Sequence, residues 1–137
     1  MELPAPLLGI DLVDPQDLGE RLQRNPELRD ELFHQGEVAY AEQQARPVEH
    51  LAARYAAKEA TVKALGIDGF EPLDIEVVDG GELTRLRLHG EAASRAERLG
   101  VTVSISLSHL PGIAAAVALA RNPPGDSPAQ AGARPHS

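Results

Sequence analysis

One long segment without an internal helix breaker limits what this chain can fold into. Residues 47–65 begin with Pro47, which suits the first turn of a helix, and Gly66 follows them as a typical helix stop. At about 100° per residue, one stripe of this helix collects the side chains of Val48, Leu51, Tyr55, Glu59 and Val62. We therefore expect a long helix with this stripe facing the core.

Alternating apolar and polar residues predict β-strands on both sides of this helix. The expected strands are a short buried one at residues 7–13 and four others at residues 73–77, 83–88, 101–107 and 113–120. Gly80-Gly81 and Pro111-Gly112 are typical of hairpin turns. Shorter helices are expected over residues 15–24, over residues 25–33 with Asn25 as N-cap, over residues 37–44 after a break at Gly36, and over residues 90–99. The hairpins imply an α+β domain, with a mainly antiparallel sheet packed against one long helix.

The length of the chain sets the number of domains. A chain of 137 residues is one ordinary domain, long enough to bury a core. We expect residues 1–121 to form this domain. Residues 122–137 are rich in proline, glycine and alanine and offer little to bury, so we expect a disordered tail there.

The composition excludes several classes of function. A net charge of −8 argues against non-specific binding of nucleic acid, and two Tyr, two Phe and no Trp argue against a platform for stacked bases. The absence of cysteine excludes disulfides, thiolate metal sites and cysteine nucleophiles. No apolar run approaches the roughly 20 residues of a membrane span, and the first residues lack a basic signal region. We expect a cytoplasmic protein without nucleic-acid or membrane partners.

Glu59 is an acidic residue in the middle of the predicted apolar stripe. A buried carboxylate without a partner costs several kcal/mol, so something should compensate its charge. An ion pair with Lys63, one helical turn later, is the structural explanation, and a metal ion or charged ligand is the functional one. The only two lysines among 13 basic residues, Lys58 and Lys63, both lie in this helix. Their position suggests a need for compact ammonium groups.

Two further residues have both a structural and a functional interpretation. Asp11 is a lone charge within the first strand, either bonded to nearby backbone or serving as a second carboxylate for Mg²⁺. His109 continues the apolar alternation of residues 101–107, either as a half-buried structural side chain or as a phosphate contact at the strand end. The other histidines, at positions 34, 50, 89 and 136, show no metal-binding spacing.

Three motifs in order carry a resemblance to a known family. They are Gly-Ile-Asp-Leu-Val at residues 9–13, Arg-Tyr-Ala-Ala-Lys-Glu-Ala at 54–60 with Lys-Ala-Leu-Gly at 63–66, and Val-Ser-Ile-Ser-Leu-Ser-His at 103–109. Together they make the chain, from about residue 7 to 120, resemble holo-acyl-carrier-protein synthase, the small single-domain 4′-phosphopantetheinyl transferases.

The resemblance implies an activity and a set of site residues. Such enzymes transfer the 4′-phosphopantetheine arm of coenzyme A to a serine of an apo acyl carrier protein, release 3′,5′-ADP, and depend on Mg²⁺. By position, Asp11 and Glu59 match the metal ligands, and Lys63 matches the lysine that meets the pyrophosphate. Glu59, or a metal-bound water beside it, is the natural acceptor of the serine proton. Arg54 and His109 match positions that line the coenzyme A site, and family members are typically homotrimers with shared sites.

The chain departs from the family pattern where the carrier is expected to dock. Asp17 stands where the family usually has an arginine that is associated with docking the acidic carrier. Arg21 and Arg24, which follow on the same predicted helix, are candidates for a replacement docking patch. The alternative is that they are solvated charges paired with Glu20 and Glu27.

Two smaller departures from the family pattern follow further along the chain. The turn after the long helix is Gly66-Ile67-Asp68-Gly69 instead of a Gly-Thr-Gly-like turn, and Leu110 follows His109 where a small polar residue is common. Asp17 favours a second hypothesis, a non-catalytic relative that binds coenzyme A or a carrier protein without transfer. The acid at Glu59 favours the enzyme, because an acid kept against its cost of burial usually has a role.

Overall fold

The computed structural model describes residues 7–80 and 83–123, so the predicted tail from residue 124 onward and Gly81 of the predicted turn lie outside the described residues. In chain order the elements are β1 (Leu7–Val13), α1 (Pro15–Arg24), α2 (Leu28–Leu32), α3 (Gln35–Glu42), α4 (Pro47–Leu65), the 3₁₀ turn η1 (Pro72–Asp74), β2 (Ile75–Gly80), β3 (Leu83–Leu88), α5 (Gly90–Leu99), β4 (Thr102–Leu110) and β5 (Ile113–Arg121). None of the described helices is long and apolar enough to cross a membrane.

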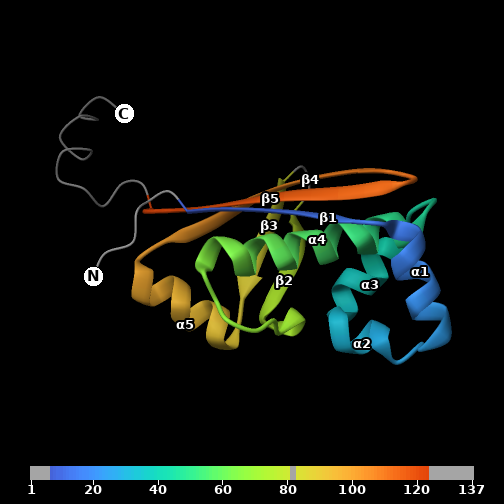
Figure 1. The fold of residues 1–137 in the computed structure, drawn as a ribbon, viewed down its shortest axis with the longest axis horizontal. Helices are drawn as coiled ribbons and strands as arrows, with labels where there is room; N and C mark the ends of the chain where they lie inside the picture. Colours follow the sequence, from blue (N-terminus) through green and yellow to red (C-terminus); the bar gives the residue numbers. More distant parts are fainter. Residues whose placement is uncertain (1–6, 81–82, 124–137) are drawn as a thin grey trace.

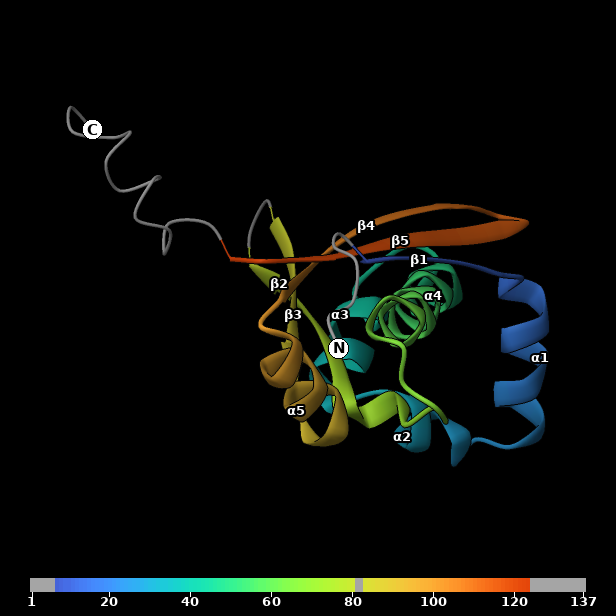
Figure 2. The same ribbon diagram turned by 60° about the vertical axis from the view of Figure 1, so that its left-hand side comes forward.

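The strands divide into two antiparallel sheets that pack around α4. The first sheet has the order β1-β5-β4, and the second is the β2-β3 hairpin. The first sheet lies along one side of α4 (Figure 1). In the second view, which looks almost along α4, α1 lies on one side of this helix and the β2-β3 hairpin with α5 on the other (Figure 2). The predicted α+β class is confirmed, with the strands in two sheets.

The long helix has its predicted ends, but the predicted stripe is only part of its buried surface: Leu51 of the stripe is buried, and Val62 packs against the core. Gly66 ends α4 in the left-handed conformation, with φ of 67°. The fully buried positions are mostly small, and Glu59 and Tyr55 are only partly buried. The buried alanines of α4 are Ala52, Ala53, Ala56, Ala57, Ala60 and Ala64. They allow a close approach of β1, where a Cβ on Gly9 would overlap the Ala60 carbonyl.

Several predicted boundaries are wrong, and each has a local cause. Asn25 is not an N-cap, because its N–H bonds to the Arg21 carbonyl and ends α1. Gly36 lies inside the first turn of α3 and does not break the chain, since the helix already begins at Gln35. The 3₁₀ turn η1 delays the start of β2 to Ile75.

Strand β1 is not buried on both faces as predicted. Its inward side chains face α4, whereas Leu8, Ile10 and Leu12 are 65%, 58% and 60% exposed. The cause is the single layer of the β1-β5-β4 sheet, which has α4 on one side only (Figure 2). The sheet therefore has an outward apolar face in the single chain.

A buried ion pair joins α4 to its neighbours. Lys58 and Glu37 are both buried, with 3.0 Å between Lys58 Nζ and Glu37 Oε1. Burial lowers the pKa of Lys58 below its ordinary value, and the Glu37 carboxylate opposes that shift. The remaining partners are the carbonyls of Pro72 and Ile75, which accept from Lys58, and the N–H groups of His34 and Val77, which donate to Glu37. One pair of charges thus holds α3, α4, η1 and β2 together.

Candidate active site

The first predicted site residues meet where β1 crosses the C-terminal half of α4. Lys63 Nζ lies 3.1 Å from Asp11 Oδ1 and donates to the Ile10 carbonyl at 3.0 Å. The Lys63 side chain is 53% exposed, whereas that of Asp11 is 13% exposed. Among the ion pairs of the described residues, Lys63 pairs with Asp11 and not with Glu59, so the structural explanation for Glu59 does not hold.

Glu59 lies one helical turn before Lys63 and therefore on the same face of α4. It is partly buried, not fully buried as the stripe predicted. Burial raises the pKa of Tyr55, and the negative charge and hydrogen bond of Glu59 raise it further, while Arg21 of α1 lowers it. The Tyr55 hydroxyl therefore stays protonated at neutral pH and donates to Glu59. Sequence reasoning missed this role, although Tyr55 stands four residues before Glu59.

The donor chemistry of this site fits a hard divalent cation. Asp11 pairs with Lys63, and Glu59 lies one helical turn before Lys63 on α4, so both carboxylates belong to the neighbourhood of the half-exposed Lys63 side chain. Mg²⁺ is usually held by one or two carboxylates, with its other positions taken by water and substrate phosphate. The ammonium of Lys63 is at the same time placed to meet a phosphate. The arrangement therefore suits chemistry on a phosphate ester or pyrophosphate.

His109 lies at the other end of α4. It is half-buried at the end of β4, as its alternation predicted, and its Nδ1 lies 3.0 Å from Glu49 Oε1. Glu49 also pairs with Arg46 at 3.5 Å. No local sequence signal joins Glu49 to His109, because the two are 60 residues apart.

A single chain does not bring His109 and Lys63 into one small site. Glu49 and Lys63 are 14 positions apart on α4, which corresponds to about 21 Å along the helix axis. Arg54 lies between these positions, is 3% exposed, and places its guanidinium carbon 4.2 Å from the centroid of the Tyr40 ring. The predicted contacts of Arg54 and His109 with coenzyme A stay predictions.

One of the two candidate docking arginines, Arg21, lies beside Tyr55, which in turn contacts Glu59. Asp17, Arg21 and Arg24 share one face of α1, and Arg21 is close enough to act on the Tyr55 hydroxyl. Within the described residues, no ion pair joins Arg21 or Arg24 to Glu20 or Glu27. The predicted patch therefore reaches the proposed site through Arg21 and Tyr55, with Asp17 as the acidic residue on the same face of α1.

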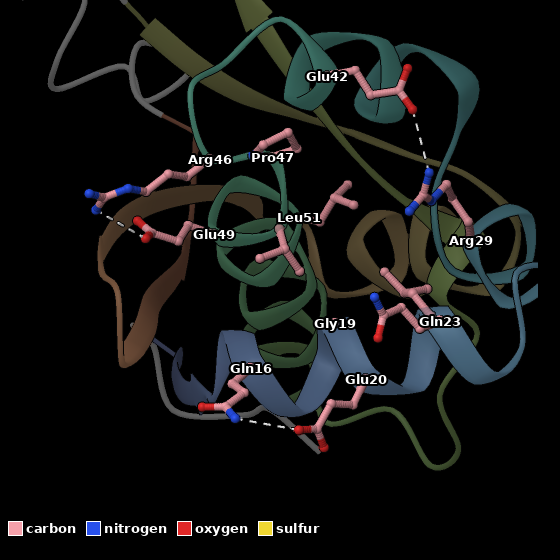
Figure 3. A pocket seen from close by; sticks show the side chains of 12 residues that line it. Gln16, Gly19, Glu20, Gln23, Arg29, Glu42, Arg46, Pro47, Glu49 and Leu51 are labelled. Carbon is pink, nitrogen blue, oxygen red and sulfur yellow. Dashed lines mark hydrogen bonds and ion pairs between the residues drawn. The ribbon is translucent and has the colours of Figure 1, made fainter.

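A groove of about 730 Å³ lies along the other edge of α1 (Figure 3). Gln16, Glu20 and Gln23 of α1 line one wall, and Arg46 and Glu49 line another. The figure shows the Arg46–Glu49 pair at the rim of this groove. The groove therefore adjoins the end of α4 that holds His109, away from Asp11 and Lys63.

Comparisons with known proteins decide the family. The sequence model of the 4′-phosphopantetheinyl transferase superfamily matches residues 7–118. The chain belongs to this superfamily. Holo-[acyl-carrier-protein] synthase of Streptomyces coelicolor is 45% identical over 116 residues, which cover 82% of this chain and 94% of the relative. The protein of the same name from Moorella thermoacetica is 42% identical over 116 residues, covering 81% of this chain and 90% of the relative.

Solved structures agree with the superfamily assignment. The Chronobacterium ammoniagenes ACPS-CoA complex has a TM-score of 0.77 and 30% identity, and covers 88% of this chain and 99% of that one. The acyl carrier protein synthase of Mycobacterium tuberculosis has a TM-score of 0.69 and 36% identity, and covers 85% and 97%. The predicted family and fold are thus confirmed.

Proposed function

We propose that the chain transfers 4′-phosphopantetheine from coenzyme A to a serine hydroxyl of an apo acyl carrier protein, which yields holo carrier protein and 3′,5′-ADP. The observation that carries the proposal is the Asp11–Lys63 pair beside Glu59, at an open edge of a chain of this superfamily. The names of its relatives support the same reaction. The cytoplasm is the expected place of the reaction.

The proposed reaction displaces 3′,5′-ADP from a phosphorus atom. The serine oxygen forms a bond to the phosphorus that carries pantetheine, and the bond from this phosphorus to the leaving 3′,5′-ADP breaks. Lys63, held by Asp11 and the Ile10 carbonyl, offsets the negative charge of the pyrophosphate. Glu59 accepts the serine proton, with its carboxylate oriented by Tyr55. Asp11 and Glu59 would hold Mg²⁺, which supplies charge neutralisation at the pyrophosphate when bound.

A non-catalytic relative is the second candidate, and Asp17 at the predicted docking face favours it. One experiment separates the two candidates. The chain is incubated with coenzyme A and an apo carrier, and chromatography measures the 3′,5′-ADP that is released. The transferase releases one 3′,5′-ADP for each carrier modified. Binding of coenzyme A in a calorimeter without any release of 3′,5′-ADP would favour the second candidate.

We further propose that the chain forms a homotrimer in which neighbouring subunits share each site. The outward face of the β1-β5-β4 sheet supports self-association, because contiguous exposed apolar surface usually marks an interface. Its members are Leu8, Ile10, Leu12, Leu110, Ile113 and Val117, between 37% and 65% exposed. The separation of about 21 Å between the His109 and Lys63 ends of α4 also favours a site completed by a second chain.

The oligomer gives the first prediction. Ile10→Glu places a charge on the outward face in the middle of strand β1, opposite Val117, and should convert a trimer into monomers with reduced transfer. Light scattering after gel filtration measures the mass, with Ser94→Glu on the exposed surface of α5 as the control. A parent chain that elutes with the mass of one subunit would contradict the proposal.

The docking face gives the second prediction. Asp17→Arg makes the face formed with Arg21 and Arg24 uniformly positive, so the KM for an acidic apo carrier should fall by about three- to tenfold while kcat stays the same. The gain should shrink as salt is raised. Glu97→Arg, an equal change of charge at an exposed site on α5, should leave KM unchanged. Equal effects of both substitutions, or an unchanged KM, would remove Asp17 from the docking account.

A further inference from the structure

Three side chains that can ligate metals meet outside the proposed active site. His34 precedes α3, Glu76 lies on β2, and His89 precedes α5. One potential ligand atom from each residue lies within 4.8 Å of the other two, and all three residues are partly buried. Within residues 7–80 and 83–123, this is the one such group of three or more His, Cys, Asp or Glu residues.

Direct contacts already hold the three side chains together. His89 Nε2 lies 2.9 Å from Glu76 Oε1, and the His34 and His89 rings are 5.2 Å apart between centroids. The His34 ring is anchored by a hydrogen bond of 2.8 Å between Nε2 and the Leu73 carbonyl. Contacts of imidazole rings with backbone carbonyls and carboxylates are also those that orient histidines in metal sites.

The Glu76 carboxylate supplies the negative charge for a cation at this cluster. Burial tends to raise the pKa of Glu76, but the hydrogen bond from His89 and the nearby His34 and Arg87 outweigh it, so the pKa is lowered and the carboxylate is ionised at neutral pH. Arg87, at 3.5 Å from Glu76, has a side chain that is 62% exposed and can turn into solvent. Lys58, also near Glu76, has its ammonium engaged by Glu37.

The N-termini of α3 and α5, which adjoin the cluster, do not repel a cation strongly. At each N-terminus a carboxylate already accepts a hydrogen bond from a backbone N–H. Asp74 Oδ2 accepts from the Glu91 N–H at 3.1 Å in the first turn of α5. Glu37 Oε1 accepts from the His34 N–H at 2.7 Å at the start of α3. Both carboxylates offset the positive ends of the helix dipoles.

The donor set determines which ion fits. Two imidazoles and one carboxylate form a ligand set of Zn²⁺ with water in the fourth position, whereas Mg²⁺ prefers oxygen ligands alone. In a tetrahedral site the ligand atoms lie about 3.3 Å apart, so separations of up to 4.8 Å must shrink by about 1.5 Å. The His89 side chain is 40% exposed, which leaves it room for this movement.

We propose that His34, Glu76 and His89 form a binding site for a divalent transition-metal ion, with Zn²⁺ as the best match. The ion replaces the proton shared between His89 and Glu76 and links the start of α3, strand β2 and the start of α5. Sequence spacing gave no sign of this site, because its ligands come from three distant segments. The inference is independent of the proposed transfer reaction, which uses Asp11, Glu59 and Lys63.

Calorimetric titration of the full chain with zinc chloride tests the proposal, with Mg²⁺ present in excess. His89→Asn removes one ligand and keeps a good N-cap residue, and Glu76→Gln removes the charge while keeping the shape. His50→Gln, at a half-buried histidine outside the cluster, is the matched control. The parent chain and the control should bind one Zn²⁺ at this site, and each cluster variant should weaken binding by at least about tenfold.

A second readout keeps the proposal testable if one variant folds poorly. Zn²⁺ should raise the midpoint of thermal unfolding of the parent chain, and this rise should be lost in His89→Asn. The proposal is overturned if the parent chain binds no Zn²⁺ at micromolar concentration, or if both cluster variants bind it as tightly as the control. Transfer activity measured with Mg²⁺ should be unchanged in His89→Asn, so failure of this inference is separate from failure of the proposed function.

Discussion

Glu59→Gln is expected to keep the fold and to lower kcat for phosphopantetheine transfer by about 10²- to 10⁴-fold. The amide has the shape of the carboxylate and can still accept from Tyr55, but it cannot take the serine proton and is a poor ligand for Mg²⁺. Because Glu59 is partly buried at an open edge, the substitution leaves the core intact.

Steady-state kinetics with a saturating apo carrier measure this loss, and circular dichroism checks the fold. Glu97→Gln, an identical change on the exposed surface of α5, should retain parental activity. Activity of Glu59→Gln close to the parental value would show that Glu59 is neither a metal ligand nor the base. The carboxylate would then need another explanation, and the Asp11–Lys63 pair would carry the site alone.

Lys58→Met is expected to lower the free energy of unfolding by about 3–5 kcal/mol. The substitution removes the ammonium from a side chain that is 0% exposed and leaves the Glu37 carboxylate buried without it. The carbonyls of Pro72 and Ile75 also lose their donor. Urea unfolding gives the free energy, and Lys63→Met, at the exposed lysine of the same helix, should cost far less stability.

A double-mutant cycle identifies the cause of this loss. Adding Glu37→Gln to Lys58→Met removes the uncompensated charge and should restore a large part of the stability. If the two single losses simply add, the buried pair is not the source of the effect.

The contribution of Lys58 to the stability of the fold depends on pH, and the sign of this dependence is defined. Burial holds the pKa of Lys58 below its ordinary value, so the unfolded chain binds more protons than the folded chain between these two pKa values. The stability contributed by Lys58 therefore rises with pH through that range. The difference in unfolding free energy between the parent and Lys58→Met should accordingly widen as the pH is raised through it.

The sequence was sufficient for features that depend on local patterns. The ends of α4 follow from Pro47 and Gly66, and the half-buried position of His109 follows from the alternation of β4. The three motifs that carried the resemblance also led to the superfamily.

Features that depend on packing between distant segments could not be predicted from the sequence. The stripe of large side chains on α4 predicted only part of the core, because close contact between α4 and β1 at Gly9 favours alanines on the rest of the buried surface. Lys63 pairs with Asp11, 52 residues away, and not with its helical neighbour. The contact between His109 and Glu49 likewise appears only in the folded chain.

Intact-mass spectrometry of an apo acyl carrier protein, incubated with this chain, coenzyme A and Mg²⁺, tests the proposed transfer most directly. We predict that the carrier gains the mass of one 4′-phosphopantetheine, and that EDTA abolishes the gain. Apo carriers from fatty-acid, polyketide and peptide synthesis should be tried in parallel. No gain with any of them, while coenzyme A still binds to the chain, would contradict the transfer reaction and favour a non-catalytic member of the superfamily.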